Sequence, residues 1–67
     1  MHNVSDVEID VGTGNWTYIV TDLDGLPYLI ILSFVDREAA EKSRMLMKNG
    51  AVADALTDAH IEITGEI

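Results

Sequence analysis

Two carboxylates stand two residues apart in the stretch Asp22-Leu23-Asp24-Gly25. By type and spacing they are the residues of this chain best suited to chemistry. A pair of neighbouring aspartates can supply a nucleophile and a general acid/base, or two oxygen ligands for a cation. Each of these chemistries needs further residues, and the rest of the sequence decides whether they are available.

Residues 18–25, an apolar stretch that runs into Asp22-Leu-Asp24-Gly25, resemble the first motif of haloacid-dehalogenase-type phosphatases. In that family the first aspartate is the nucleophile and the second an acid/base, roles that the resemblance implies for Asp22 and Asp24. The match ends at Leu26, where the family has threonine. The chain after Gly25 is also too short for the family's Rossmann-like domain and its later lysine and acidic motifs. Because Asp-Gly is the preferred centre of a type I′ hairpin turn, we expect a turn here, no catalytic residue and no enzyme.

A calcium site fails on spacing. An EF-hand loop needs glycine at its sixth position and glutamate at its twelfth, and counted from Asp22 these positions hold Pro27 and Ser33. The only histidines, His2 and His60, have no cysteine and no spaced ligand cluster around them, so we expect surface residues. The sequence therefore predicts no metal site and no cofactor.

The flanks of Asp24-Gly25 have strand composition, and the second flank is almost entirely apolar. A two-residue loop would pair Thr21 with Tyr28. The alternation of side chains then gives two faces. One predicted face holds Trp16, Tyr18, Val20, Leu29, Ile31, Ser33 and Val35. The other, outer face holds Thr17, Ile19, Thr21, Tyr28, Ile30, Leu32 and Phe34.

The N-terminal segment alternates apolar and acidic residues between 4 and 11, which is typical of a half-exposed strand. A four-residue loop at 12–15 would pair Val11 with Trp16 and place Val7, Ile9 and Val11 on the face of Tyr18. In these registers all three strands place apolar side chains on the same face of the sheet. They predict an antiparallel meander at about 4–11, 16–23 and 26–35.

A helix is predicted at about 37–49, because Asp36 is a good N-cap and Gly50 a good stop. Its small-residue side suits close packing on a sheet. Residues 51–59 repeat apolar side chains at helical spacing and are compatible with a second short helix, and 60–67 alternate like a fourth strand. That strand would be parallel to the third after one helix, or antiparallel after two. The whole is one α+β domain, 1–67.

Size and composition favour self-association. The chain has 67 residues, 48% of them hydrophobic, and no cysteine. A domain this small is marginally stable without disulfides, a bound metal or oligomerisation. We expect a homodimer through the outer sheet face, at Ile19, Tyr28, Ile30, Leu32 and Phe34. The alternatives are that residues 51–59 of the same chain or a larger partner cover this face. We also expect a cytoplasmic protein with no membrane contact, because the sequence lacks an evident targeting segment or a long apolar run.

Charge limits the partners. Twelve acidic and four basic residues give a net charge of −8, which opposes direct binding of nucleic acid. Asp6, Glu8 and Asp10 would lie about 6.6 Å apart along a strand, near the phosphate spacing of DNA. The sequence thus predicts a non-catalytic protein-interaction module. The alternative is an acidic inhibitor or DNA mimic, of the kind found among bacterial or phage accessory proteins, and an edge of acidic residues also serves solubility.

Overall fold

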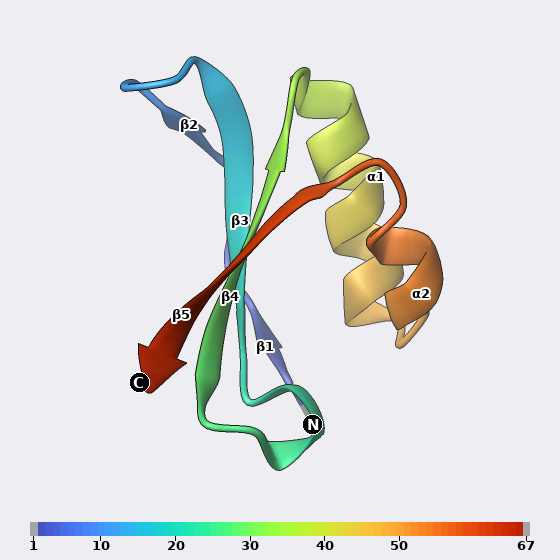
Figure 1. The fold of residues 1–67 in the computed structure, drawn as a ribbon. Helices are drawn as coiled ribbons and strands as arrows, with labels where there is room; N and C mark the ends of the chain where they lie inside the picture. The colour runs from blue at the N-terminus through green and yellow to red at the C-terminus, as the bar shows by residue number, and fades with distance from the viewer. Residues whose placement is uncertain (1, 67) are drawn as a thin grey trace.

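The computed structural model describes residues 2–66. Met1 and Ile67, which the predicted domain 1–67 includes, lie outside the described residues, as does the last position of the predicted strand 60–67. The fold is α+β, as predicted. Its elements along the chain are β1 (Asn3–Val4), β2 (Glu8–Asp10), β3 (Asn15–Thr21), the 3-10 turn η1 (Leu23–Gly25), β4 (Tyr28–Phe34), α1 (Arg37–Lys48), α2 (Val52–Ala55) and β5 (His60–Glu66) (Figure 1).

The strands form one antiparallel sheet in which β3 and β4 are central and β5 is an edge. β1 and β2 both pair with β3 and together make the other edge, so the predicted first strand is divided in two. Asp10 pairs with Asn15, and residues 11–14 form the connecting turn. The predicted pairing of Val11 with Trp16 is wrong, because Val11 lies in this turn and is 92% exposed. Ile9 does share the face of Trp16, its cross-strand partner.

The helices cover one face of the sheet (Figure 1). The predicted N-cap is confirmed, since a carboxylate oxygen of Asp36 accepts a hydrogen bond from the Ala39 N–H at 2.8 Å. Gly50 follows the helix with φ +86, the left-handed conformation that glycine adopts without strain. α2 lies within the predicted segment 51–59. Because two helices separate β4 from β5, the last strand returns antiparallel, one of the two arrangements that the sequence left open.

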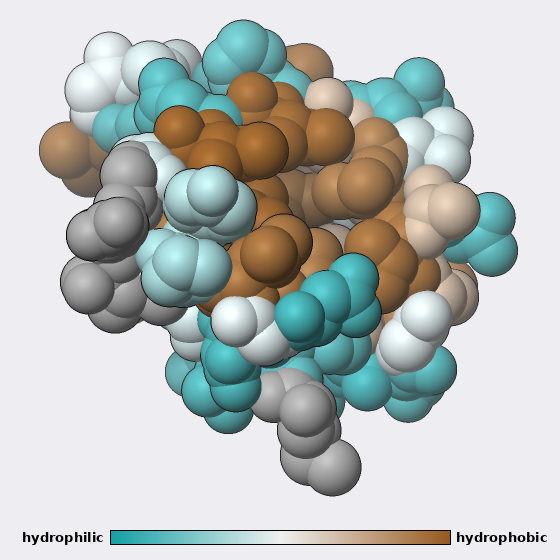
Figure 2. All heavy atoms as spheres, turned by 60° about the horizontal axis from the view of Figure 1, so that its bottom comes forward, coloured by the Kyte–Doolittle hydropathy of each residue, from teal (hydrophilic) through white to brown (hydrophobic). Residues whose placement is uncertain are grey.

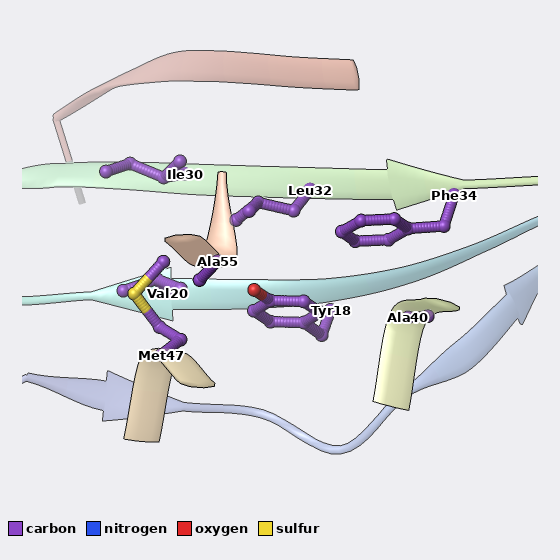
Figure 3. Close-up of a cluster of buried hydrophobic side chains, with 8 residues drawn as sticks. All are labelled: Tyr18, Val20, Ile30, Leu32, Phe34, Ala40, Met47 and Ala55. Carbon is purple, nitrogen blue, oxygen red and sulfur yellow. The ribbon is translucent and has the colours of Figure 1, made fainter. Parts of the chain in front are cut away.

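The core lies between the sheet and the helices (Figure 3). The aromatic rings of Tyr18 and Phe34 stack with centroids 6.1 Å apart and 6° between their planes. Such stacked pairs add to the free energy gained by burial alone. The buried apolar residues come from β3, β4, α1 and α2: Tyr18, Val20, Ile30, Leu32, Phe34, Ala40, Met47 and Ala55.

The register of the β3–β4 hairpin differs from the prediction by one residue. Thr21 pairs with Leu29 instead of Tyr28. The predicted two-residue turn would have placed Pro27 opposite Asp22, where proline has no N–H to donate. The chain instead forms the longer turn η1, closed by a hydrogen bond from the Leu26 N–H to the Leu23 carbonyl at 3.0 Å.

A shift of one residue moves every side chain of a strand to the opposite face. The prediction that Ile30, Leu32 and Phe34 lie on the outer face is therefore wrong. They are 8%, 0% and 6% exposed and pack under the helices. The outer face of β4 holds Ile31, opposite Ile19, and also Leu29 and Ser33. That face carries fewer and smaller apolar groups than predicted.

A buried chain of hydrogen bonds joins the sheet to both helices. The Ser43 hydroxyl on α1 donates to the Ala55 carbonyl on α2 at 2.6 Å. The Tyr18 hydroxyl on β3 lies 2.6 Å from the Ser43 oxygen. Ser43 has one hydroxyl hydrogen and donates it to the Ala55 carbonyl. Tyr18 must therefore be the donor in its hydrogen bond with Ser43. Both buried hydroxyls are thereby satisfied.

Replacing Ser43 should destabilise the fold more than removing the Tyr18 hydroxyl. Ser43→Ala leaves two buried groups, the phenol and the Ala55 carbonyl, without partners, which costs about 1–3 kcal/mol. Tyr18→Phe leaves the Ser43–Ala55 bond intact and should cost about 0.5–1.5 kcal/mol. Urea unfolding of both variants measures the order. A larger loss for Tyr18→Phe would contradict this account of the donors.

The same tyrosine should make stability fall in alkali. Burial raises the pKa of Tyr18 above its ordinary value of 10.0, and the hydrogen bond that its phenol donates to Ser43 is lost on ionisation. The unfolded chain therefore releases the phenolic proton first. The stabilising contribution is complete below about pH 10 and is lost as the pH rises through the raised pKa of the folded state. Denaturant midpoints from pH 8 to 11 should fall more steeply for the wild type than for Tyr18→Phe.

Candidate functional site

The Asp22-Leu-Asp24-Gly25 stretch forms an exposed turn. Asp22 and Asp24 both have left-handed backbones, with φ 60 and 54, which aspartate tolerates better than most residues. Asp24 lies within η1, the only 3-10 turn among the described residues, and Asp22 directly precedes it. The geometry of the turn therefore explains why aspartate occurs at both positions. No group of three His, Cys, Asp or Glu side chains within residues 2–66 is arranged to hold a metal ion.

A surface hollow of about 700 Å³ lies between α1 and the segment that runs from α2 to β5. Phe34 and Leu46 line it, together with Asp54, Asp58 and Lys42. The nearby carboxylate of Asp36 is already engaged in capping α1. Every buried side-chain nitrogen or oxygen in the described part of the chain has a hydrogen-bond partner. The hollow therefore offers no unpartnered buried group to activate a substrate.

The acidic row predicted from the sequence is broken. Glu8 and Asp10 lie on β2, opposite Thr17 and Asn15. Asp6 lies in the break between β1 and β2, where the pairing with β3 shifts by one residue. One of its carboxylate oxygens is 3.1 Å from Nη2 of Arg44. Only two of the three carboxylates therefore share a strand.

Both arginines of α1 contact the sheet side of the molecule. Arg44 donates from Nε to the Ser5 carbonyl at 2.7 Å, and so fastens the break between β1 and β2 to the helix. The guanidinium of Arg37 lies 5.6 Å from the centre of the Trp16 ring, a cation–π contact, and also pairs with Glu41 at 3.7 Å. Both guanidinium groups are thus engaged in contacts within the molecule.

The two histidines occupy separate structural positions. Nε2 of His2 lies 2.6 Å from the Met47 carbonyl near the end of α1, and this side chain is half-buried. The same carbonyl also accepts from the Gly50 N–H at 3.1 Å, so the histidine adds a second hydrogen bond at the end of α1. His60 is exposed at the start of β5, opposite Ser33. Neither position has the neighbours of a metal site.

The feature that sequence reasoning missed is an uncovered end of the core. Ile61 and Ile63 on β5 pair with Leu32 and Ile30, so they lie on the helix side of the sheet. The helices do not reach over them, and they are 40% and 62% exposed. Figure 2 shows apolar residues around a hollow at this end of the molecule. We call this surface the open apolar end and define it by Ile61 and Ile63.

The predicted interface residues are divided by the structure. Ile30, Leu32 and Phe34 belong to the core, whereas Ile19 is 36% and Tyr28 41% exposed. Ile19 lies on the outer face, opposite Ile31. The alternation of 60–64 was visible in the sequence, but whether a helix covers Ile61 and Ile63 depends on the whole fold.

Comparison with models of protein families, with curated proteins and with solved structures found no match to this chain. No helix among residues 2–66 is both long enough and apolar enough to cross a membrane.

Asp22 and Asp24 should be dispensable for any hydrolysis of phosphate esters. We expect no turnover of a generic aryl phosphate with magnesium, because both side chains sit on an exposed turn and the resemblance to phosphatases ends at Leu26. The wild type and Asp22→Asn should give the same background rate. Turnover that the wild type supports and Asp22→Asn abolishes would restore the phosphatase hypothesis.

Proposed function

We propose that this chain is a non-catalytic protein-interaction module that binds through the open apolar end and exists as a homodimer. The observation that supports this is the exposure of Ile61 and Ile63, at 40% and 62%, on the same side of the sheet as the buried core. Exposed apolar groups next to a core are typical of a surface that a partner completes.

The energy available at this surface is substantial for so small a domain. Fully burying an isoleucine side chain is worth about 1.5–3 kcal/mol relative to leaving it in water. In a twofold dimer each such residue counts twice. The gain must exceed the translational and rotational entropy lost on association, so an interface of this kind is expected to be of modest affinity.

The homodimer predicted from the sequence used a different surface. Three of its five residues, Ile30, Leu32 and Phe34, are buried beneath the helices and cannot contact a partner without unfolding. The open apolar end takes their place in the proposal. The acidic-inhibitor alternative stays a prediction, with the carboxylates of Glu8 and Asp10 as its remaining row.

An acidic substitution at the open apolar end should abolish association. Ile63→Asp places a charge where the proposal needs an apolar contact, whereas Val11→Asp makes the same change of charge in an exposed turn. We expect light scattering from micromolar to roughly millimolar concentration to show dimer for the wild type and Val11→Asp, and monomer for Ile63→Asp.

A monomeric wild type would overturn the homodimer, and affinity capture from the cells that naturally make the chain would then test whether the open apolar end binds a foreign protein. A monomer that also captures nothing sensitive to Ile63→Asp would overturn the interaction module as well. Circular dichroism must show that Ile63→Asp is folded. Because Ile63 is already mostly exposed, its replacement should cost little stability.

A further inference from the structure

The two edges of the sheet are protected unequally. At one edge β1 and β2 are only 2 and 3 residues long, and the break between them is held to α1 by Arg44. Short, interrupted edge strands are a usual defence against pairing with another chain. At the other edge β5 runs for 7 residues, His60–Glu66, without lysine or proline, and its pairing with β4 is regular from His60 to Thr64 and shifts by one residue only at Gly65. Within the described residues nothing pairs with its outer side.

We propose that β5 pairs antiparallel with β5 of a second copy, around a twofold axis at Ile63, so that two sheets become one. This inference rests on the proposed function and specifies its interface. An exposed edge strand offers a row of backbone donors and acceptors, for which another strand is the natural occupant. A twofold axis perpendicular to the sheet keeps the helices of both copies on the same side.

The register follows from the strand itself. Ile63 is the middle residue of His60–Glu66, so an axis there pairs the strand with itself, regularly at its centre and with the irregularity at Gly65 falling toward each end. Ile63 then faces Ile63 of the second copy, and Glu62 faces Thr64. An axis at Glu62 would set two carboxylates directly opposite each other, which is destabilising.

The open apolar end explains why a second copy fits. α2 precedes β5, so the helical cover lies beside the His60 end of the strand (Figure 1). Exposure rises from 40% at Ile61 to 62% at Ile63, away from that cover. Antiparallel pairing sets the covered end of each copy beside the uncovered end of the other. Each copy thereby supplies the apolar contacts that its partner lacks.

Single cysteines test the register directly, because the chain has no cysteine of its own. In the proposed pairing residue 63 of one copy lies opposite residue 63 of the other. Ile63→Cys therefore places two cysteines whose Cα atoms are within the range of roughly 4.4–6.8 Å that a disulfide spans. Ile61→Cys is the matched control on the same strand and face. Its two copies would lie four residues out of register, beyond about 7 Å, so it should not cross-link.

Under mild oxidation we expect Ile63→Cys to form a covalent dimer roughly tenfold or more faster than Ile61→Cys, since only the first pair can close without backbone movement. Equal rates, or a faster Ile61→Cys, would overturn the pairing. Glu62→Cys cross-linking fastest would place the axis at Glu62 and overturn the register.

The two proposals fail in different ways. A wild-type dimer that Ile63→Asp dissociates, with no preference for cross-linking at Ile63→Cys, would leave the interaction module standing and remove the β5 pairing. A monomeric wild type that binds a foreign protein through Ile63 would likewise remove the second copy as the occupant of this edge. Absence of any association sensitive to Ile63→Asp would remove both.

Discussion

The hydrogen bond from Ser43 to the Ala55 carbonyl, with Tyr18 donating to Ser43, is the contact on which the arrangement of layers depends. It links β3, α1 and α2 at one point. α2 has only 4 residues, too few to be stable as an isolated helix, so its position must come from tertiary contacts. The placement of α2 in turn decides where the chain enters β5, and therefore which part of the sheet the helices leave uncovered.

The second constraint is the turn η1. Because η1 makes the loop between β3 and β4 longer than a two-residue turn, it shifts the pairing by one residue and so sets which residues of β4 face the helices. Leu32 and Phe34 fill the core beside Tyr18, while Ile31 is turned outward to a face bordered by threonine and serine. The large apolar groups of a nearly continuous hydrophobic strand are thus divided unequally between the two faces, and the core receives the aromatic residue.

Local signals in the sequence were sufficient for most of the elements. Asp36 and Gly50 marked the ends of α1, because caps act within one turn of the helix. The register of β4 was not predictable from Asp24-Gly25 alone, since the dipeptide favours a two-residue turn that Pro27 opposes. The exposure of Ile61 and Ile63 was even harder to predict from the sequence. It depends on how far α2 extends over the sheet, and no residue near β5 encodes that distance.

The break between β1 and β2 would limit how far an assembly built on β5 pairing can grow. In the proposed dimer, the sheet edges left among residues 2–66 of each copy are the two formed by β1 and β2. Each offers strands of 2 and 3 residues, with Glu8 and Asp10 on the longer one. A third copy would find no continuous row of backbone donors and acceptors at these edges. The carboxylates on its own β2 would also be repelled by Glu8 and Asp10. The pairing would close at two copies instead of propagating into a fibril.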